Sequence, residues 1–149
     1  MNCCRIITGE RGEGKTTALY HLASSISSPK GFISLHEDDA YYLLNLSTGD
    51  RNLLMTSSSL YPDRIGRWSY DKKLFEKACS MLSAIDSGDV FIDEVGRLEL
   101  SGKGFAPALK VLVEKPVSLY LSVRKPFLAD VITAFSLQNA VIEEVEASL

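Results

Sequence analysis

A glycine-rich loop near the start of this 149-residue chain constrains its fold more than any other feature. The segment 9–17 reads GERGEGKTT and matches the phosphate-loop (Walker A) pattern of glycine, lysine and threonine in full. Glycines let the backbone wrap so that successive N–H groups converge on an anion, and the helix that follows points its positive dipole end at the same place. The pattern therefore predicts a phosphate-binding loop between a buried strand over 3–8 and a helix over 15–27.

Each residue of this loop has an expected part in holding phosphate. We expect Lys15 to reach the β- and γ-phosphates of a nucleotide and the Thr16 hydroxyl to coordinate Mg²⁺. The side chains of Glu10 and Glu13 are expected to face solvent, because acids are unfavourable beside phosphate. The predicted phosphate-binding residues are Gly9, Glu10, Arg11, Gly12, Glu13, Gly14, Lys15, Thr16 and Thr17.

A second motif supplies the acids that a phosphate loop alone lacks. The run 90–94 reads VFIDE, three apolar residues followed by two acids, as at the carboxyl end of a buried parallel strand (Walker B). Hydrolysis needs a metal anchor and a group that positions water. We expect Asp93 to share the Mg²⁺ with Thr16, and Glu94 to orient or activate the attacking water.

The order of the predicted elements indicates an α/β fold. Strands alternate with helical segments, which implies a mostly parallel sheet with helices on both faces. The predicted fold class is the three-layer sandwich of the P-loop NTPases, in one domain over 1–149. A glutamate directly after the Walker B aspartate indicates the RecA-like branch, with strand order 5-1-4-3-2 and a polar residue, here Ser122, ending the fourth strand to sense the γ-phosphate. The region 38–70 breaks the alternation and predicts a small antiparallel β extension at one edge.

The limits of the other elements follow from periodicity and from capping and turn residues. Further strands are predicted over 31–36, 41–46, 65–70, 90–92, 117–123 and 140–145, and further helices over 71–85, 105–114 and 126–135.

The composition of the chain limits the classes of partner that we expect. The net charge is −3 and lysine and arginine are scattered, so we expect no binding to nucleic acid. No apolar run approaches the roughly 18 residues of a membrane span, so no membrane association is expected. The three cysteines form no disulfide framework, which favours a reduced, cytoplasmic protein. We expect a monomer or a weak homo-oligomer that binds nucleoside triphosphates.

Arginines and aromatic residues complete the set of candidates. An arginine near the transferred phosphoryl group stabilises its charge, and Arg97 and Arg124 both follow predicted core strands at their carboxyl ends. Glu99 is expected to pair with one of these arginines or with Lys15. Trp68 and Tyr70 are candidates to stack on a base, with packing in the core as the alternative.

A longer stretch carries a family resemblance. Residues 92–100 read IDEVGRLEL and, with GERGEGKTT and Ser122-Val123-Arg124, resemble the small nucleoside-triphosphatase family that includes the thermophile and the human cancer-related nucleoside-triphosphatases. Ordered matches run from about residue 5 to 135. The resemblance implies Mg²⁺-dependent hydrolysis of nucleoside 5′-triphosphates with loose base preference. The segment 36–41 departs from the family pattern, because it lacks an arginine and a second Gly-Phe.

Hydrolysis of nucleoside triphosphates to diphosphate and phosphate is therefore the predicted function, with Glu94, Lys15, Arg97 and Arg124 as catalytic residues. Two alternatives remain open from the sequence. A nucleotide or small-molecule kinase would share the loop and need an acceptor pocket and an arginine lid, for which only Arg64 and Arg67 are available. A nucleotide-gated regulatory binding protein would use hydrolysis as a timer.

Overall fold

A single nine-stranded sheet organises the computed structural model, which describes residues 1–145. Five of its strands are parallel and lie next to one another in the order β2-β7-β8-β1-β9. They are β1 (Cys3–Gly9), β2 (Lys30–Glu37), β7 (Gly88–Val95), β8 (Val117–Arg124) and β9 (Val141–Glu144). Numbered from one to five along the chain, these strands read 5-1-4-3-2 across the sheet, so β1 and the phosphate loop lie between β8 and β9.

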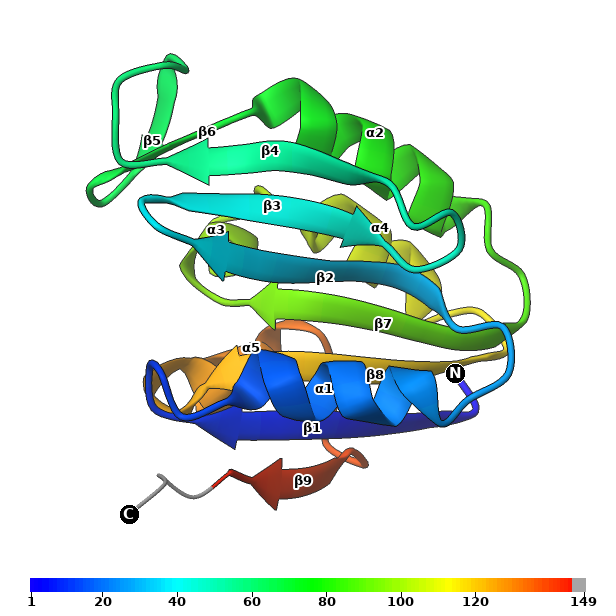
Figure 1. Cartoon of the computed structure of the whole chain (residues 1–149). Helices are drawn as coiled ribbons and strands as arrows, with labels where there is room; N and C mark the ends of the chain where they lie inside the picture. Colours follow the sequence, from blue (N-terminus) through cyan, green and yellow to red (C-terminus); the bar gives the residue numbers. More distant parts are fainter. Residues whose placement is uncertain (146–149) are drawn as a thin grey trace.

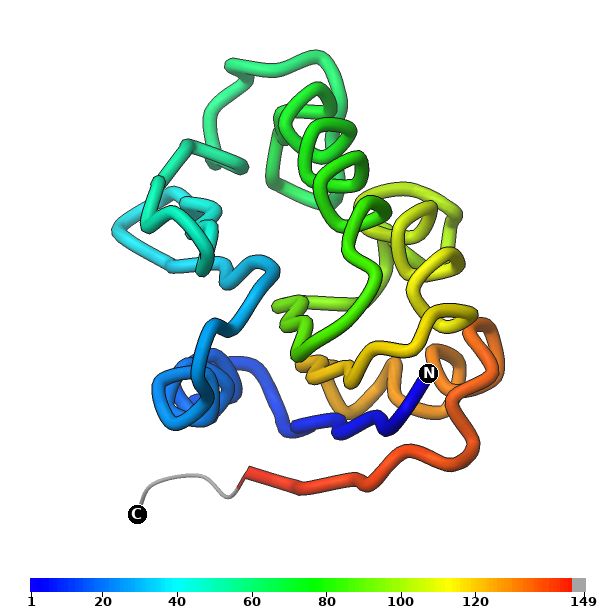
Figure 2. The backbone as a smooth tube through the Cα atoms, turned by 90° about the vertical axis from the view of Figure 1, so that its right-hand side faces the viewer, coloured from blue at the N-terminus to red at the C-terminus, as the bar shows by residue number. Residues whose placement is uncertain are grey.

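Helices cover both faces of this sheet and give three layers. Helix α1 (Lys15–Ser24) lies on one face, while α2 (Lys72–Ser83), α4 (Ala106–Leu112) and α5 (Leu128–Ala134) lie on the other (Figures 1 and 2). A short α3 (Arg97–Leu100) follows β7, and a 3₁₀ turn η1 (Lys125–Phe127) follows β8. Among residues 1–145, no helix is long and apolar enough to cross a membrane.

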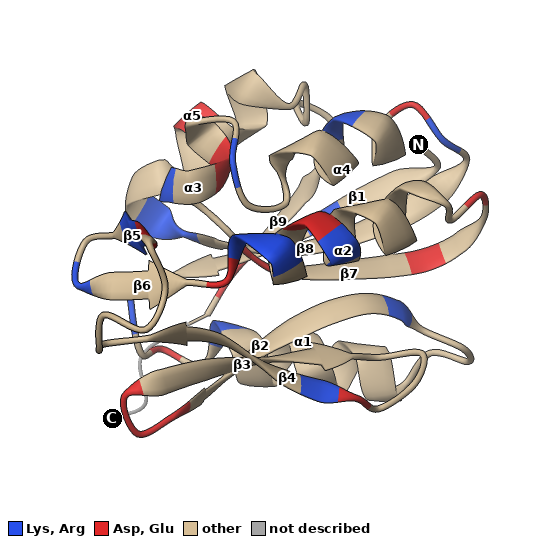
Figure 3. Cartoon of the chain, turned by 90° about the horizontal axis from the view of Figure 1, so that it is seen from above, with Lys and Arg blue, Asp and Glu red and all other residues tan. Residues whose placement is uncertain are grey.

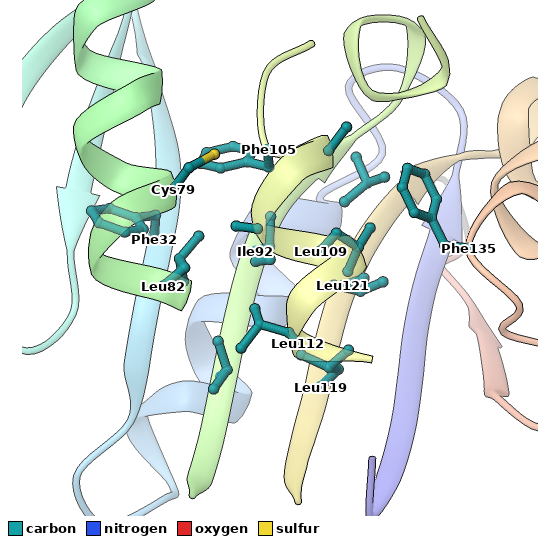
Figure 4. Close-up of a cluster of buried hydrophobic side chains, with 14 of the residues drawn as sticks. Phe32, Cys79, Leu82, Ile92, Phe105, Leu109, Leu112, Leu119, Leu121 and Phe135 are labelled. Carbon is teal, nitrogen blue, oxygen red and sulfur yellow. The ribbon is translucent and has the colours of Figure 1, made fainter. Parts of the chain in front are cut away.

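The buried strands contribute side chains to a hydrophobic core on each face of the sheet. Along β7, Ile92 packs with Leu82 of α2 and Leu109 of α4 in the larger core (Figure 4). Its neighbour Phe91 points the other way and joins the smaller core beneath α1, where it stacks on Tyr120 with ring centroids 4.4 Å apart. Because successive residues of a strand face opposite sides, a strand covered on both faces must be apolar throughout, as the run 90–92 is.

An antiparallel extension continues the sheet beyond β2. It consists of β3 (Ala40–Asn45), β4 (Arg51–Thr56), β5 (Asp63–Ile65) and β6 (Trp68–Tyr70). The single strand predicted over 65–70 is wrong, because Gly66 adopts a φ of 56° and turns the chain between β5 and β6. The Arg64 guanidinium fastens this turn by donating to the Arg67 carbonyl oxygen at 3.0 Å. Strand β4 was not predicted at all.

Two local signals agree with the structure. Asp71 caps α2, since its side chain accepts a hydrogen bond from the Leu74 backbone N–H at 3.2 Å. Gly31 has a φ of 106°, and a Cβ at this position would lie 2.0 Å from the Phe91 carbonyl oxygen. Only glycine therefore allows β2 to approach β7 this closely.

Candidate active site

The loop between β1 and α1 has the backbone that the glycine pattern predicts. Gly12 and Gly14 have φ angles of 79° and 85°, in the left-handed region that favours glycine. A Cβ on Gly9 would lie 3.3 Å from the Val145 carbonyl oxygen, so a side chain there would be crowded. Gly14 is the N-cap of α1, so the first turn of the helix directs its free N–H groups into the loop.

Lys15 crosses the inside of this loop. Its side chain is only 6% exposed, and its Nζ donates to the Glu10 carbonyl oxygen at 3.0 Å. The same Nζ lies 3.8 Å from Oε2 of Glu94. A buried ammonium held over the loop in this way is a ready counter-ion for a bound phosphate.

The two glutamates of the loop behave differently. Glu10 is exposed, as are Arg11 and Thr17. Glu13 is half-buried, and its Oε1 accepts a hydrogen bond from the Glu10 backbone N–H at 2.8 Å. The glycine pattern does not predict this contact, which folds part of the side chain back onto the loop.

Asp93 is the most constrained side chain of the site. It is 1% exposed, and its Oδ2 accepts hydrogen bonds from the Thr16 hydroxyl at 2.9 Å and from the Ser34 N–H at 3.1 Å. Its Oδ1 accepts from the Ser122 hydroxyl, which is fully buried. Burial raises the pKa of Asp93, and these hydrogen bonds and the charge of Lys15 oppose that rise.

Ser34 belongs to the site, although we did not single it out from the sequence. Its hydroxyl donates to the Asp93 carbonyl oxygen at 2.6 Å, so Ser34 holds both the backbone and the side chain of Asp93. The available signal was a lone serine in the apolar strand sequence Phe32-Ile33-Ser34-Leu35. Ser122, predicted to sense a phosphate, has its hydroxyl directed at Asp93.

Glu94 follows Asp93 through a cis peptide bond and lies at the mouth of the site. Its side chain is 40% exposed, so it reaches solvent while its neighbour does not. Burial of the carboxyl raises its pKa, and the charge of Asp93 adds to this rise. The charges of Lys15, Arg124 and Arg11 oppose the rise, and the Nζ of Lys15 lies 3.8 Å from this carboxylate.

The two candidate arginines occupy different surroundings. Arg124 ends β8, and its guanidinium lies over the Phe127 ring, 5.3 Å from the centroid. Its Nε is buried and has no hydrogen-bond partner within residues 1–145. Arg97 is exposed at the start of α3, and its guanidinium approaches the β5–β6 turn, 3.8 Å from where a Cβ on Gly66 would lie. Figure 3 shows α3 and β5 on the same side of the molecule, with basic residues coloured on both elements.

Glu99 does not pair with an arginine or with Lys15, and that expectation is wrong. Its carboxylate accepts hydrogen bonds from the backbone N–H groups of Gly96 at 2.8 Å and Phe105 at 2.9 Å. It is 5% exposed, and burial raises its pKa to about 7.

The two aromatic candidates for base stacking lie apart. Tyr70 is buried against Phe75, which leaves it no face for a base. Trp68 packs edge-on against Tyr41 and carries the Arg67 guanidinium 4.6 Å from its ring centroid. Tyr41 also stacks on His36 at 4.5 Å, so the extension presents an aromatic cluster at this edge of the sheet.

A hollow of about 430 Å³ adjoins the first turn of α1. It is lined by Thr16, Thr17, Tyr20, His21, Leu35, Leu44 and Arg51. Thr16 lines this hollow and also contacts Asp93 at the predicted metal position.

The donor set at Thr16 and Asp93 suits magnesium. Mg²⁺ prefers oxygen ligands, keeps several waters and is usually bound through one or two protein groups together with substrate phosphates. A hydroxyl and a carboxylate that already lie 2.9 Å apart fit this pattern. No cluster of three or more His, Cys, Asp or Glu side chains able to hold a metal occurs within residues 1–145.

Comparisons with known proteins point to one family. A family model described as NTPase matches residues 4–146 of the chain. The nucleoside-triphosphatase THEP1 of Methanosarcina barkeri (strain Fusaro / DSM 804) is 30% identical over 125 residues, which cover 74% of this chain and 71% of that protein. The nucleoside-triphosphatase THEP1 of Thermotoga sp. (strain RQ2) is 25% identical over 127 residues, which cover 80% of this chain and 73% of that protein.

Solved structures share the fold. The solution structure of a human cancer-related nucleoside triphosphatase matches with a TM-score of 0.75 at 25% identity, covering 97% of this chain and 89% of that chain. The crystal structure of THEP1 from the hyperthermophile Aquifex aeolicus matches with a TM-score of 0.74 at 19% identity, covering 95% of this chain and 89% of that chain.

Proposed function

Because the chain belongs to the NTPase family, and is thus a nucleoside-triphosphatase, we propose that it hydrolyses nucleoside 5′-triphosphates to diphosphate and phosphate with Mg²⁺ and with loose base preference. The membership confirms the resemblance drawn from residues 92–100. The observation that carries the proposed chemistry is the contact between Thr16, at the phosphate loop, and Asp93, next to Glu94. It supports one reaction centre formed from the two motifs.

Lys15 and the loop amides bind the phosphates in this mechanism. Within residues 1–145, the Nζ of Lys15 has the Glu10 carbonyl oxygen at 3.0 Å and the Glu94 carboxylate at 3.8 Å as partners, so a phosphate oxygen offers it a stronger charged hydrogen bond. The N–H groups of the first turn of α1 add donors whose dipoles favour an anion. The loop from Gly9 to Thr17 therefore binds the phosphate groups of the substrate.

Thr16 and Asp93 are the proposed holders of Mg²⁺. An ion held there together with the substrate would neutralise charge on the phosphate oxygens. Ser34 and Ser122 keep the Asp93 carboxylate in one orientation, as hydrogen-bonded outer partners do for metal-binding acids.

Glu94 is the proposed group that orients water and accepts its proton. It reaches solvent, lies beside the phosphate-binding lysine, and has a raised pKa, which makes its carboxylate a better proton acceptor than a free glutamate. The Nε of Arg124 is buried and has no hydrogen-bond partner among residues 1–145. Arg124 is therefore the better supported of the two arginines for stabilising the negative charge on the transferred phosphoryl group. The guanidinium of Arg97 lies instead at the β5–β6 turn, 3.8 Å from where a Cβ on Gly66 would lie.

Loose base preference is supported by what the sequence lacks. The chain contains no Asn-Lys-x-Asp motif of the kind that reads guanine. We also propose a reducing, cytoplasmic compartment, which the free thiols of Cys3, Cys4 and Cys79 support.

Phosphate release from ATP, GTP, CTP and UTP, each with Mg²⁺ and with the metal chelated, tests the proposal. We expect release from all four with rates within about tenfold of one another, and loss of release without metal. Release that persists after chelation, or that occurs with one base alone, contradicts the metal or the base assignment respectively.

A further inference from the structure

A buried acid outside the phosphate site ties the strand that carries Glu94 to the core. Glu99 bridges two backbone donors with its two oxygens, Oε1 to the Gly96 N–H and Oε2 to the Phe105 N–H. Gly96 lies two residues after Glu94 and starts the turn into α3. Phe105 precedes α4 and is 1% exposed, packed against Phe75 with ring centroids 5.1 Å apart.

The ionised form of Glu99 is energetically unfavourable in its buried position. Among residues 1–145 no ion pair involves Glu99, and the titratable groups that face it are Glu94 from β7, Tyr70 from β6 and Cys79 from α2. None of these is a cation. A buried carboxylate without a cation needs full hydrogen bonding, and here each oxygen receives one backbone donor.

The chain makes room for this carboxylate at one glycine. A Cβ on Gly104 would lie 2.1 Å from Oε2 of Glu99 and 3.1 Å from its Cδ. Gly102, in the same loop, has a comparable left-handed φ of 82°, but a Cβ there would meet nothing within 4 Å. A Cβ on Gly104 would also lie 3.2 Å from the Leu98 Cβ. Comparing alanine at the two glycines therefore separates the cost of a left-handed backbone from the cost of the contacts at Gly104, of which the closest by far is with the Glu99 carboxylate.

We infer that Glu99 is a positioning residue for the hydrolysis, which fixes the Gly96 turn on the core and thereby holds Glu94 at the phosphate loop. This inference rests on the proposed role of Glu94. A misplacement of about 1 Å at a reacting group costs about 10²-fold in rate. The loop amides and Lys15, which are proposed to bind the substrate, are not attached to this turn, so we expect nucleotide binding to be preserved.

Three variants test the inference at about pH 8, where the Glu99 carboxylate is mostly ionised. Glu99→Gln leaves one oxygen acceptor for two donors, and Gly104→Ala pushes the intact carboxylate away. We expect both to lower kcat for MgATP about 10–100-fold, with KM and the Kd for MgADP within about twofold of wild type. Gly102→Ala is the matched control, and its kcat is expected to stay within about twofold.

Hydrogen exchange of the Gly96 amide gives a second readout that does not depend on hydrolysis. The amide is expected to be protected in wild type and in Gly102→Ala, and to exchange at least about tenfold faster in both Glu99→Gln and Gly104→Ala. If wild type releases no phosphate, the proposed function is refuted. Exchange of the Gly96 amide would then still show whether Glu99 fixes the turn.

Two outcomes overturn the inference. One is that Gly104→Ala and Gly102→Ala have the same kcat. This outcome counts even if Glu99→Gln fails to fold. The other is a loss of MgADP affinity in proportion to the loss of kcat, since that would make Glu99 a support of nucleotide binding or of the fold as a whole.

Discussion

The Thr16 hydroxyl and Oδ2 of Asp93 are 2.9 Å apart, although 77 positions separate the two residues in the sequence. Thr16 lies in the first turn of α1, which follows β1, and Asp93 lies near the end of β7, with β8 between these two strands. Parallel strands end at the same edge of the sheet, so the topology brings the two motifs together, and Ser122 of β8 fills the place between them.

Replacing Gly31 is expected to unfold the sheet where β2 meets β7. A Cβ in Gly31→Ala would lie 2.0 Å from a backbone oxygen that cannot move aside. We expect a loss of at least about 3 kcal/mol in the free energy of unfolding, measured by urea denaturation. Gly49→Ala, with a φ of 82° and nothing within 4 Å of its Cβ, is the control and should cost about 1–2 kcal/mol. Equal losses in the two variants would contradict the close approach.

Glu99 makes stability depend on pH in a defined direction. Its pKa rises from 4.5 to about 7 on folding, so the folded protein holds the proton more tightly than the unfolded chain. Ionisation of Glu99 therefore lowers the free energy of unfolding as pH rises from about 4.5 to about 7, by up to about 3 kcal/mol. In Glu99→Gln this loss is absent, so the variant gains stability relative to wild type as pH rises.

Urea denaturation of wild type and Glu99→Gln at several pH values checks this sign. Glu114→Gln removes an exposed acid and controls for the loss of one negative charge. The burial effect would be refuted if the free energy of unfolding of Glu99→Gln stayed constant or fell relative to that of wild type as pH rises.

Ser122 is expected to matter for metal affinity more than for nucleotide binding. Ser122→Ala removes one hydrogen bond from Oδ1 of Asp93 in a fully buried position. Loss of such an outer partner typically costs about 10–100-fold in metal affinity, so we expect the Mg²⁺ concentration for half-maximal phosphate release to rise by at least about tenfold. Ser118→Ala, on the same strand, is the control. An unchanged Mg²⁺ requirement would mean that Thr16 and Ser34 suffice to orient Asp93.

Phosphoryl transfer to another nucleotide is not expected. Arg64, one of two arginines available for a kinase lid, already donates hydrogen bonds to the Arg67 carbonyl oxygen and to the Ser59 hydroxyl. Incubation with γ-labelled ATP and each nucleoside or nucleoside monophosphate should yield labelled phosphate alone. Label in a nucleotide product would favour the kinase and would make the hollow beside Thr16 its acceptor site.

The motifs were predictable because their chemistry requires particular residues at fixed spacing. Gly9 to Thr16 and the pair Asp93-Glu94 could be read directly, and the parallel strands followed from apolar runs such as 90–92. The contact of Glu99 with the Phe105 N–H and that of Glu13 with the Glu10 N–H could not be predicted, because a hydrogen bond to the backbone requires no particular residue type at the donor position. Strand β4 was missed because its half-buried residues alternate weakly in an edge extension.

Glu94→Gln gives the most direct test of the reaction centre, measured as MgATP binding by calorimetry and phosphate release in a single turnover. The amide keeps the shape of the side chain but cannot accept a proton, so we expect a Kd within about threefold of wild type and release slowed by about 10²–10⁴-fold. Lys15→Ala is the comparison, in which binding itself should fail. Release by Glu94→Gln at the wild-type rate would contradict the role of Glu94 and, with it, the joining of the two motifs into one active site.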